Sequence, residues 1–223
     1  MAFSNELVDY VQAKRKNGHS FGGVPVYNLT IQDALELKKL ARKYQFPAEW
    51  LANLINHESA GTFNPAVVNP SSGATGLIQF MPSTARGLGT TTNTLSKLTF
   101  QQQLVWVDKY LQGILKRAYT NGAINPQFKE IDLYMAIFYP VSMFNPNYQF
   151  PSNVVAANGG IKTPMDYYNK VMQKAIFKNI PLEQGVLGMA SQEKTATMPV
   201  LITLSVAIGV TFVALFLYDK YKQ

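Results

Sequence analysis

An apolar helix that ends in a single acid and runs into a long polar loop limits the possible folds of this chain more than any other feature. The spacing of residues 47–58 predicts a helix, because one face carries Trp50, Leu51, Leu54 and Ile55. Glu58 continues this apolar stripe at the helix end. Residues 59–85 are rich in Gly, Pro, Asn and Ser, which predicts irregular backbone. We therefore expect a core helix whose last carboxylate faces a long loop.

Glu58 stands alone as an acid, since no other Asp or Glu occurs from residue 59 to residue 107. A carboxyl group at the edge of an apolar surface keeps its proton to a higher pH than a solvated one. A general acid needs this property near neutral pH. A Glu at a helix end can also serve only as a cap or an ion-pair partner, so the position alone leaves both roles open.

The segment from Glu58 to Ala85 resembles the catalytic core of the soluble-lytic-transglycosylase (SLT, goose-lysozyme-like) family. The family pattern is E-S, a short loop with F-x-P, and then G-A-x-G-L-M-Q-x-M-P-x-T-A. The matching residues here are Glu58-Ser59, Phe63-x-Pro65 and the run from Gly73 to Ala85, with Ile78 in place of the usual Met. The resemblance implies a mainly α, lysozyme-like fold. It also implies cleavage of peptidoglycan glycan strands between N-acetylmuramic acid and N-acetylglucosamine, which leaves 1,6-anhydro ends.

The same resemblance implies roles for individual residues of this segment. Glu58 is then the catalytic acid and base. Ser59 would orient Glu58 or an N-acetyl group of the substrate. Gln79 would hydrogen-bond a sugar, and Gly76 would let the backbone approach the glycan closely.

The third motif of the family, A-x-A-Y-N-A-G, has an altered counterpart in this chain. Residues 136–140 read A-I-F-Y-P, so Tyr139 carries over as a substrate-binding residue while the Asn-Ala-Gly that follows it in the family does not. Phage-borne members of the family can carry F-Y-P at this place. The variant therefore favours a bacteriophage origin.

The mechanism of glycosidic bond cleavage depends on whether the site has one carboxylic acid or two. Glycosidases with two carboxylates need the second acid within about 5–9.5 Å of the first. The remaining candidates are Asp108, Glu130 and Asp132. With Glu58 alone, the carboxyl group can protonate the glycosidic oxygen and then take the proton from the sugar's own 6-hydroxyl. This favours transglycosylation; a single-acid hydrolase of goose-lysozyme type and an inactive, glycan-binding structural membrane protein are the alternatives.

The composition restricts other functions. The chain of 223 residues has no Cys and only two His, so we expect no disulfide, no thiolate or His-based metal site and no cofactor. A formal net charge of +7 is spread over the sequence, which does not indicate nucleic acid binding and suits an anionic polymer such as the cell wall.

The rest of the chain predicts further helices and no convincing strand. Capping patterns predict helix starts at Thr30, Thr99 and Thr163, and the apolar run from 131 to 139 predicts a buried helix. We expect residues 1–29 to form an N-terminal extension with a short amphipathic helix, residues 30–178 the lysozyme-like domain, and residues 179–198 a linker.

A segment near the C-terminus predicts a single transmembrane helix at residues 199–219, followed by a short basic tail at 220–223. Its core from Val200 to Tyr218 holds nineteen residues without a charge, about 28 Å as a helix. We therefore expect a lipid bilayer as a partner. The N-terminus carries no secretory signal pattern, so we expect the internal membrane of a phage virion, with other virion membrane proteins as neighbours, or the bacterial inner membrane, with the enzyme domain facing the wall when it acts.

Overall fold

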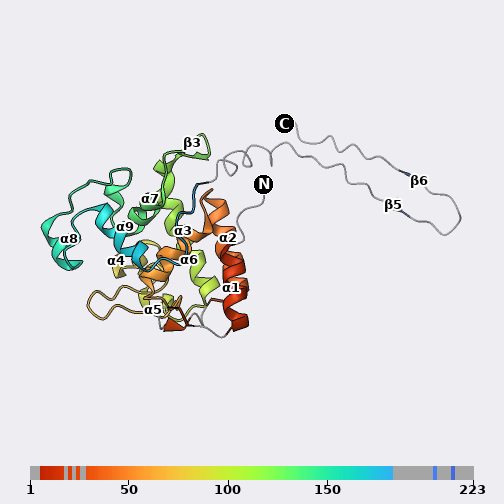
Figure 1. The fold of residues 1–223 in the computed structure, drawn as a ribbon, viewed down its shortest axis with the longest axis horizontal. Helices are drawn as coiled ribbons and strands as arrows, with labels where there is room; N and C mark the ends of the chain where they lie inside the picture. The colour runs from red at the N-terminus through yellow and green to blue at the C-terminus, as the bar shows by residue number, and fades with distance from the viewer. Residues whose placement is uncertain are drawn as a thin grey trace.

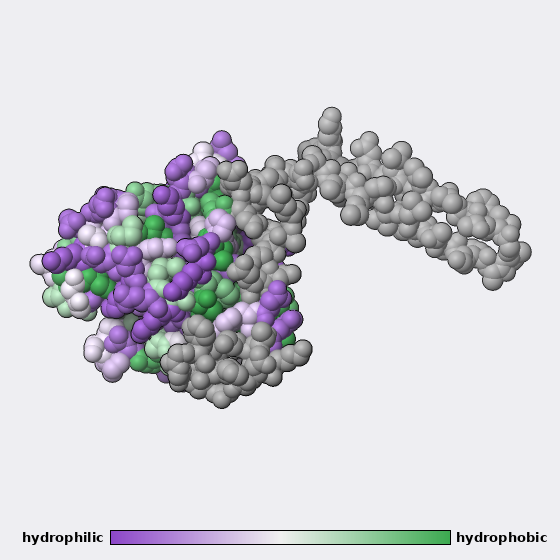
Figure 2. Space-filling view, in the orientation of Figure 1, coloured by the Kyte–Doolittle hydropathy of each residue, from purple (hydrophilic) through white to green (hydrophobic). Residues whose placement is uncertain are grey.

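The computed structural model describes residues 6–17, 20–21, 24–25, 29–182, 203–204 and 212–213. This part of the chain is mainly helical, as the sequence predicts, and Figure 1 shows the helices gathered into one body. Figure 2 shows hydrophilic residues over much of the face in view. The α-helices are α1 (Glu6–Asn17), α2 (Ile31–Lys43), α3 (Ala48–Glu58), α4 (Pro82–Gly87), α5 (Thr92–Leu95), α6 (Phe100–Ile114), α7 (Glu130–Phe138), α8 (Ser152–Ala157) and α9 (Pro164–Gln173).

Short elements complete the described part. Two 3-10 helices follow α6 and α7, namely η1 (Leu115–Ala118) and η2 (Pro140–Ser142). Antiparallel pairs of two-residue strands are formed by β1 (Ser20–Phe21) with β2 (Val24–Pro25), and by β3 (Tyr119–Thr120) with β4 (Ala123–Ile124). These strands are not predicted from the sequence, because two residues are too few for an alternating pattern.

The three predicted helix starts are confirmed. Thr30 accepts a hydrogen bond from the Asp33 amide at 3.0 Å, and the Asp33 carboxylate accepts one from the Thr30 amide at 2.8 Å. The same reciprocal box begins α6 at Thr99 and α9 at Thr163. Each box satisfies two amides that would otherwise lack a partner at the helix start, which stabilises a helix by about 1 kcal/mol.

Helix α1 is part of the helical body rather than an extension of it. Leu7 and Val11 are buried in the core, and the Leu7 amide donates to the Glu49 carboxylate at 3.3 Å. α1 packs against both α2 and α3, and Figure 1 shows it alongside α2. The predicted boundary after residue 29 therefore does not separate two packing units.

Helix α3 lies at the centre of the core, and one of its faces holds the chain that follows α9. Trp50, Asn53 and Asn56 are spaced three residues apart and so share a face. The Trp50 indole donates to the Ile180 carbonyl at 2.8 Å, and the Asn56 amide donates to the Lys174 carbonyl at 3.0 Å. This packing continues beyond residue 178, where the sequence predicts the linker to begin.

Asn53 is the most highly bonded residue on that face. Its side chain is fully buried, accepts from the amides of Ile176 and Phe177 at 2.9 and 3.0 Å, and donates to the Phe177 carbonyl at 2.7 Å. It also donates to Glu130 of α7 at 3.1 Å. One side chain thus joins α3, α7 and the segment after α9.

The predicted transmembrane helix at 199–219 lies almost entirely outside the described residues. The exceptions are β5 (Thr203–Leu204) and β6 (Phe212–Val213), which pair antiparallel. Among the residues that the structure describes, none of the helices has the length and apolar character needed to cross a bilayer. The span therefore stays a prediction.

Candidate active site

The loop between α3 and α4, residues 59–81, begins at a buried serine. The Ser59 hydroxyl donates to the Ile55 carbonyl at 2.6 Å and accepts from the Phe63 amide at 2.9 Å, and the side chain has no exposed surface. Both bonds fix the turn by which the chain leaves α3. The hydroxyl is thus engaged within the protein, in the turn that directly follows Glu58.

Gly76 is buried in the same loop and has a positive φ of +86°. A Cβ at this position would lie 2.2 Å from Oε1 of Gln103. The glycine is therefore required by the approach of Gln103 to the backbone. The expected approach of the glycan at this position stays a prediction, and the structure adds an internal reason for the glycine.

Gln103 joins this loop to α6 through hydrogen bonds. It is fully buried in α6 and accepts a hydrogen bond from the Leu77 amide at 2.6 Å. Its amide group donates to the carbonyls of Pro65 at 3.0 Å and Leu95 at 2.8 Å. These bonds satisfy polar backbone groups that irregular structure would otherwise leave buried without partners.

Gln79 lies at the tip of a tight turn. The backbones of Thr75 and Phe80 pair through two hydrogen bonds of 3.0 and 2.8 Å, and Gln79 adopts a positive φ of 52° between them. Its side chain is half-buried and donates to the Gly76 carbonyl at 3.1 Å. The carbonyl oxygen of this side chain accepts no bond within the described part of the chain, so it is available to a sugar hydroxyl.

Glu58 ends α3 beside a tyrosine from α9. Its side chain is half-buried, and the buried Tyr167 hydroxyl donates a hydrogen bond to its Oε1 atom. Burial raises the pKa of Glu58 to about 7, while the hydrogen bond from Tyr167 and the charge of Lys170 act in the opposite direction. A carboxyl group in this state can both give and take a proton near neutral pH.

Aromatic rings connect Glu58 to Tyr139. Tyr167 stacks on Phe138 with ring centroids 4.2 Å apart, and Phe138 packs edge-on against Phe150 at 5.5 Å. Tyr139 contacts Phe150 at 5.2 Å and Tyr148 at 5.8 Å. The structure thus brings two of the predicted site residues, Glu58 and Tyr139, to the two ends of one aromatic cluster.

The His57 ring also packs against Tyr167, edge-on, with the two ring centroids 5.7 Å apart. Burial, with the charges of Lys170 and Lys174, lowers the pKa of His57 to about 4. Its Nδ1 atom is buried and has no hydrogen-bond partner in the described structure. The ring is therefore neutral near pH 7 and adds no charge beside Glu58.

The three other carboxylates that could form an acid pair with Glu58 are each held elsewhere. Asp108 accepts from the Lys43 ammonium at 2.7 Å and from the Tyr44 hydroxyl at 2.6 Å. Glu130 accepts hydrogen bonds from the Asn53 amide and from the hydroxyls of Tyr134 and Tyr168.

The third of these acids, Asp132, accepts from the amides of Lys129 at 2.8 Å and Phe144 at 2.7 Å. These bonds engage all three carboxylates in contacts within the protein, most of them with other elements. Glu58 therefore stays the candidate acid of this site.

No group of three or more His, Asp or Glu side chains within the described residues is arranged to hold a metal ion.

Two residues of the candidate site, Tyr167 and Gln103, were not predicted from the sequence. Tyr167 follows a recognisable helix start at Thr163, but nothing local links it to Glu58. Gln103 follows the helix start at Thr99 and looks like one of three consecutive glutamines. Its burial beside Gly76 depends on how α6 meets the loop, which a single sequence does not reveal.

The comparison with protein families identifies the first half of this site. Residues 37–105, about a third of the chain, match the family model described as Transglycosylase SLT domain. This segment holds Glu58, the loop and Gln103, and it ends before Tyr139 and Tyr167. Neither the curated proteins nor the solved structures include a significant match. Over residues 37–105 the chain is therefore similar to SLT transglycosylases.

Proposed function

We propose that the protein is a peptidoglycan lytic transglycosylase in which Glu58 acts first as a general acid and then as a general base. The observation that carries this proposal is the half-buried Glu58 carboxyl, whose pKa is raised to about 7 and which is hydrogen-bonded by Tyr167. This carboxyl lies within the segment that matches the SLT domain. The substrate is the β-1,4 bond between N-acetylmuramic acid and N-acetylglucosamine.

In the first step, Glu58 gives its proton to the glycosidic oxygen, and the bond from that oxygen to C1 of the muramic acid breaks. In the second step, the Glu58 carboxylate takes the proton of the 6-hydroxyl, and the oxygen at C6 forms a bond to C1. The N-acetylglucosamine leaves with the proton that it received, and the muramic acid ends as the 1,6-anhydro sugar. The proton on Glu58 is restored, and no water is consumed.

The other residues of the candidate site have supporting roles in this mechanism. Tyr167 stays protonated, since burial and the Glu58 charge raise its pKa well above the usual value, and it therefore remains a hydrogen-bond donor to the carboxylate. Tyr139 and Gln79 are the candidate sugar-binding residues, because both side chains keep exposed surface. Ser59 and Gly76 act from within the protein, by fixing the loop that carries Gln79.

Mass spectrometry of the released muropeptides tests the proposal. Digestion of purified peptidoglycan should give products that carry 1,6-anhydro ends, which are lighter than reducing ends by one water. Reducing ends would instead identify a single-acid hydrolase of goose-lysozyme type. Glycan binding without cleavage would identify the inactive, structural alternative.

We also propose that residues 199–219 anchor this enzyme in a membrane. The uncharged run from Val200 to Tyr218 supports the anchor. The F-Y-P variant at residues 138–140 supports a phage virion with an internal membrane as its setting, where the enzyme would open the cell wall for genome entry. Proteomic analysis of purified virions and of their membrane fraction tests this setting.

A further inference from the structure

Lys170 of helix α9 and Lys174, directly after the helix, lie near the end of α3, where the charge of Lys170 acts on Glu58 and both charges act on His57. Tyr167, Lys170 and Lys174 are spaced three and four residues apart, so they follow one another along one face. The first of them is hydrogen-bonded to Glu58, and the backbone of the last accepts from Asn56 of α3 at 3.0 Å. Lys170 is therefore held between two points at which α9 is bonded to the end of α3.

Both ammonium groups are available to a ligand. The Lys170 and Lys174 side chains are exposed. In the part of the chain that the structure describes, ion pairs join Lys39 to Glu36 and Lys43 to Asp108, so neither Lys170 nor Lys174 has a carboxylate within 4.0 Å.

The nearest acid along the helix is Asp166, one turn before Lys170. Its carboxylate accepts from the amides of Lys162 and Thr163 at the helix start, at 3.1 and 2.9 Å. The loop opposite contributes no acid, because residues 59–81 contain none. Two unpaired positive charges thus border the site.

These charges do not help the catalytic acid to hold its proton. A cation beside a carboxyl group favours the ionised form, and Lys170 indeed acts to lower the pKa of Glu58. The position of Lys170 is therefore not explained by the role of Glu58 as a general acid. Attraction of an anionic part of the substrate is such a reason, since opposite charges steer and orient ligands.

The substrate class of the proposed function offers only one kind of anion at this place. The N-acetylated sugars of the glycan backbone are neutral. The lactyl group of each muramic acid carries a short peptide, and that peptide has free carboxylates. We propose that Lys170 and Lys174 bind the stem-peptide carboxylates of the muramic acid next to the cleaved bond, so that the enzyme prefers peptide-bearing glycan over bare glycan. This inference rests on the proposed function.

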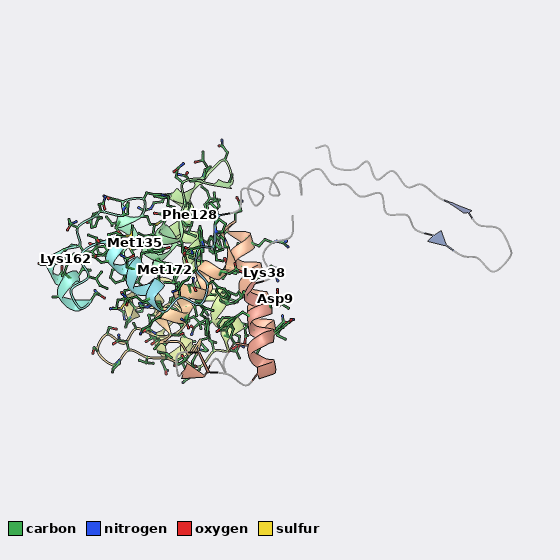
Figure 3. All side chains as sticks on the ribbon, viewed as in Figure 1. Asp9, Lys38, Phe128, Met135, Lys162 and Met172 are labelled. Carbon is green, nitrogen blue, oxygen red and sulfur yellow. The ribbon has the colours of Figure 1, made fainter. Side chains whose placement is uncertain are left out.

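The test compares two soluble substrates that differ only in the peptide. One is uncross-linked glycan strands with stem peptides, and the other is the same strands after an amidase has removed the peptides and the lactyl carboxylates that this exposes have been converted to neutral amides. Lys170→Met and Lys174→Met keep the length of the side chain and remove the charge. Lys162→Met is the matched control, since Lys162 is exposed and Figure 3 shows it at the outer edge of the body, close to α8.

The double variant should lose about 2- to 20-fold in kcat/KM on peptide-bearing strands, because one exposed ion pair contributes about 1.5- to 5-fold. Bare strands should be cleaved at nearly the wild-type rate at each enzyme's own pH optimum. Added salt should reduce the preference of the wild type for peptide-bearing strands. Strands whose peptide carboxylates are amidated should behave like bare strands.

Two outcomes would overturn the inference. An equal loss on both substrates would mean that the lysines act only through Glu58, and no loss on either would mean that they bind no carboxylate. If the wild type cleaves neither substrate, the proposed function fails separately. The inference is then decided by binding: the Glu58→Gln protein should hold peptide-bearing strands more tightly than bare strands, and the added lysine substitutions should abolish that difference.

Discussion

Tyr167 donates its hydroxyl hydrogen bond to Glu58 across 109 residues of sequence. The acid comes from the end of α3, inside the segment that matches the SLT domain, while the tyrosine comes from α9, outside it. Helix α7 completes the arrangement, because Phe138 stacks on the same tyrosine ring. The site therefore forms only when the second half of the chain packs onto the first.

Glu58→Gln should lower the rate of glycan cleavage by about 10²- to 10⁴-fold, because the amide cannot transfer a proton and acid–base catalysis contributes that much. Muropeptide release from purified peptidoglycan measures the loss. Glu36→Gln is the matched control and should keep full activity, because Glu36 is a partly exposed acid whose side-chain bonds in the described structure join it only to its helix neighbours Gln32 and Lys39. Residual cleavage by Glu58→Gln within tenfold of the wild type would remove Glu58 from its proposed role.

The rate should fall as the pH rises through about 7. The acid step requires protonated Glu58, and burial raises the pKa of this carboxyl to about 7, so the active form is lost above that value. Tyr167→Phe removes a hydrogen bond that favours the carboxylate, so it should move the descending limb of the profile to higher pH while it lowers the maximal rate. A kcat–pH profile of both proteins is the measurement, and an unchanged limb in the variant would show that Tyr167 does not act on the proton of Glu58.

Gln103→Leu should destabilise the domain by at least about 2 kcal/mol. The substitution leaves the Leu77 amide and the carbonyls of Pro65 and Leu95 without their partner, and each buried unsatisfied group costs about 1–3 kcal/mol. Urea denaturation followed by circular dichroism measures the change. Gln101→Leu, at an exposed position two residues away, should cost much less, and equal costs would mean that Gln103 does not fasten the loop.

Truncations should locate the end of the folded domain. A chain ending at residue 182 should stay folded and active, whereas a chain ending at residue 173 loses the backbone partners of Trp50, Asn53 and Asn56 and should unfold. Thermal denaturation and peptidoglycan cleavage compare the two. The opposite ranking would show that the bonds from α3 to this segment are dispensable.

A separate comparison tests the anchor. The full chain should float with lipid vesicles and require detergent, and residues 1–198 should be soluble and retain specific activity. A full chain that stays in solution without detergent would remove the anchor.

The local parts of this structure could be predicted, and the long-range parts could not. The starts of α2, α6 and α9 follow from hydrogen bonds between residues three apart, so the pattern at Thr30 contains all the needed information. The apolar stripe of α3 likewise indicates that Glu58 borders the core. Tyr167, by contrast, gains its role from a contact that nothing near it in the sequence specifies.

Gly76 and Ser59 illustrate a different limit. Their positions match a catalytic motif, and the sequence cannot tell whether a motif residue contacts the substrate or supports a neighbour. The structure shows the supporting contacts, because the Gln103 side chain lies against Gly76 and the Phe63 amide donates to the Ser59 hydroxyl. Both residues therefore have a part in the shape of the loop.

The bonds from α3 to the chain after α9 define a path for mechanical load. Tension applied beyond Leu182 would reach the Trp50–Ile180 hydrogen bond first and the three bonds from Asn53 to Ile176 and Phe177 next. All of these lie on the helix that ends in Glu58. A tether pulled from that side would therefore strain the catalytic helix before any other element, and the cleavage rate of a surface-attached enzyme would depend on the force that it carries.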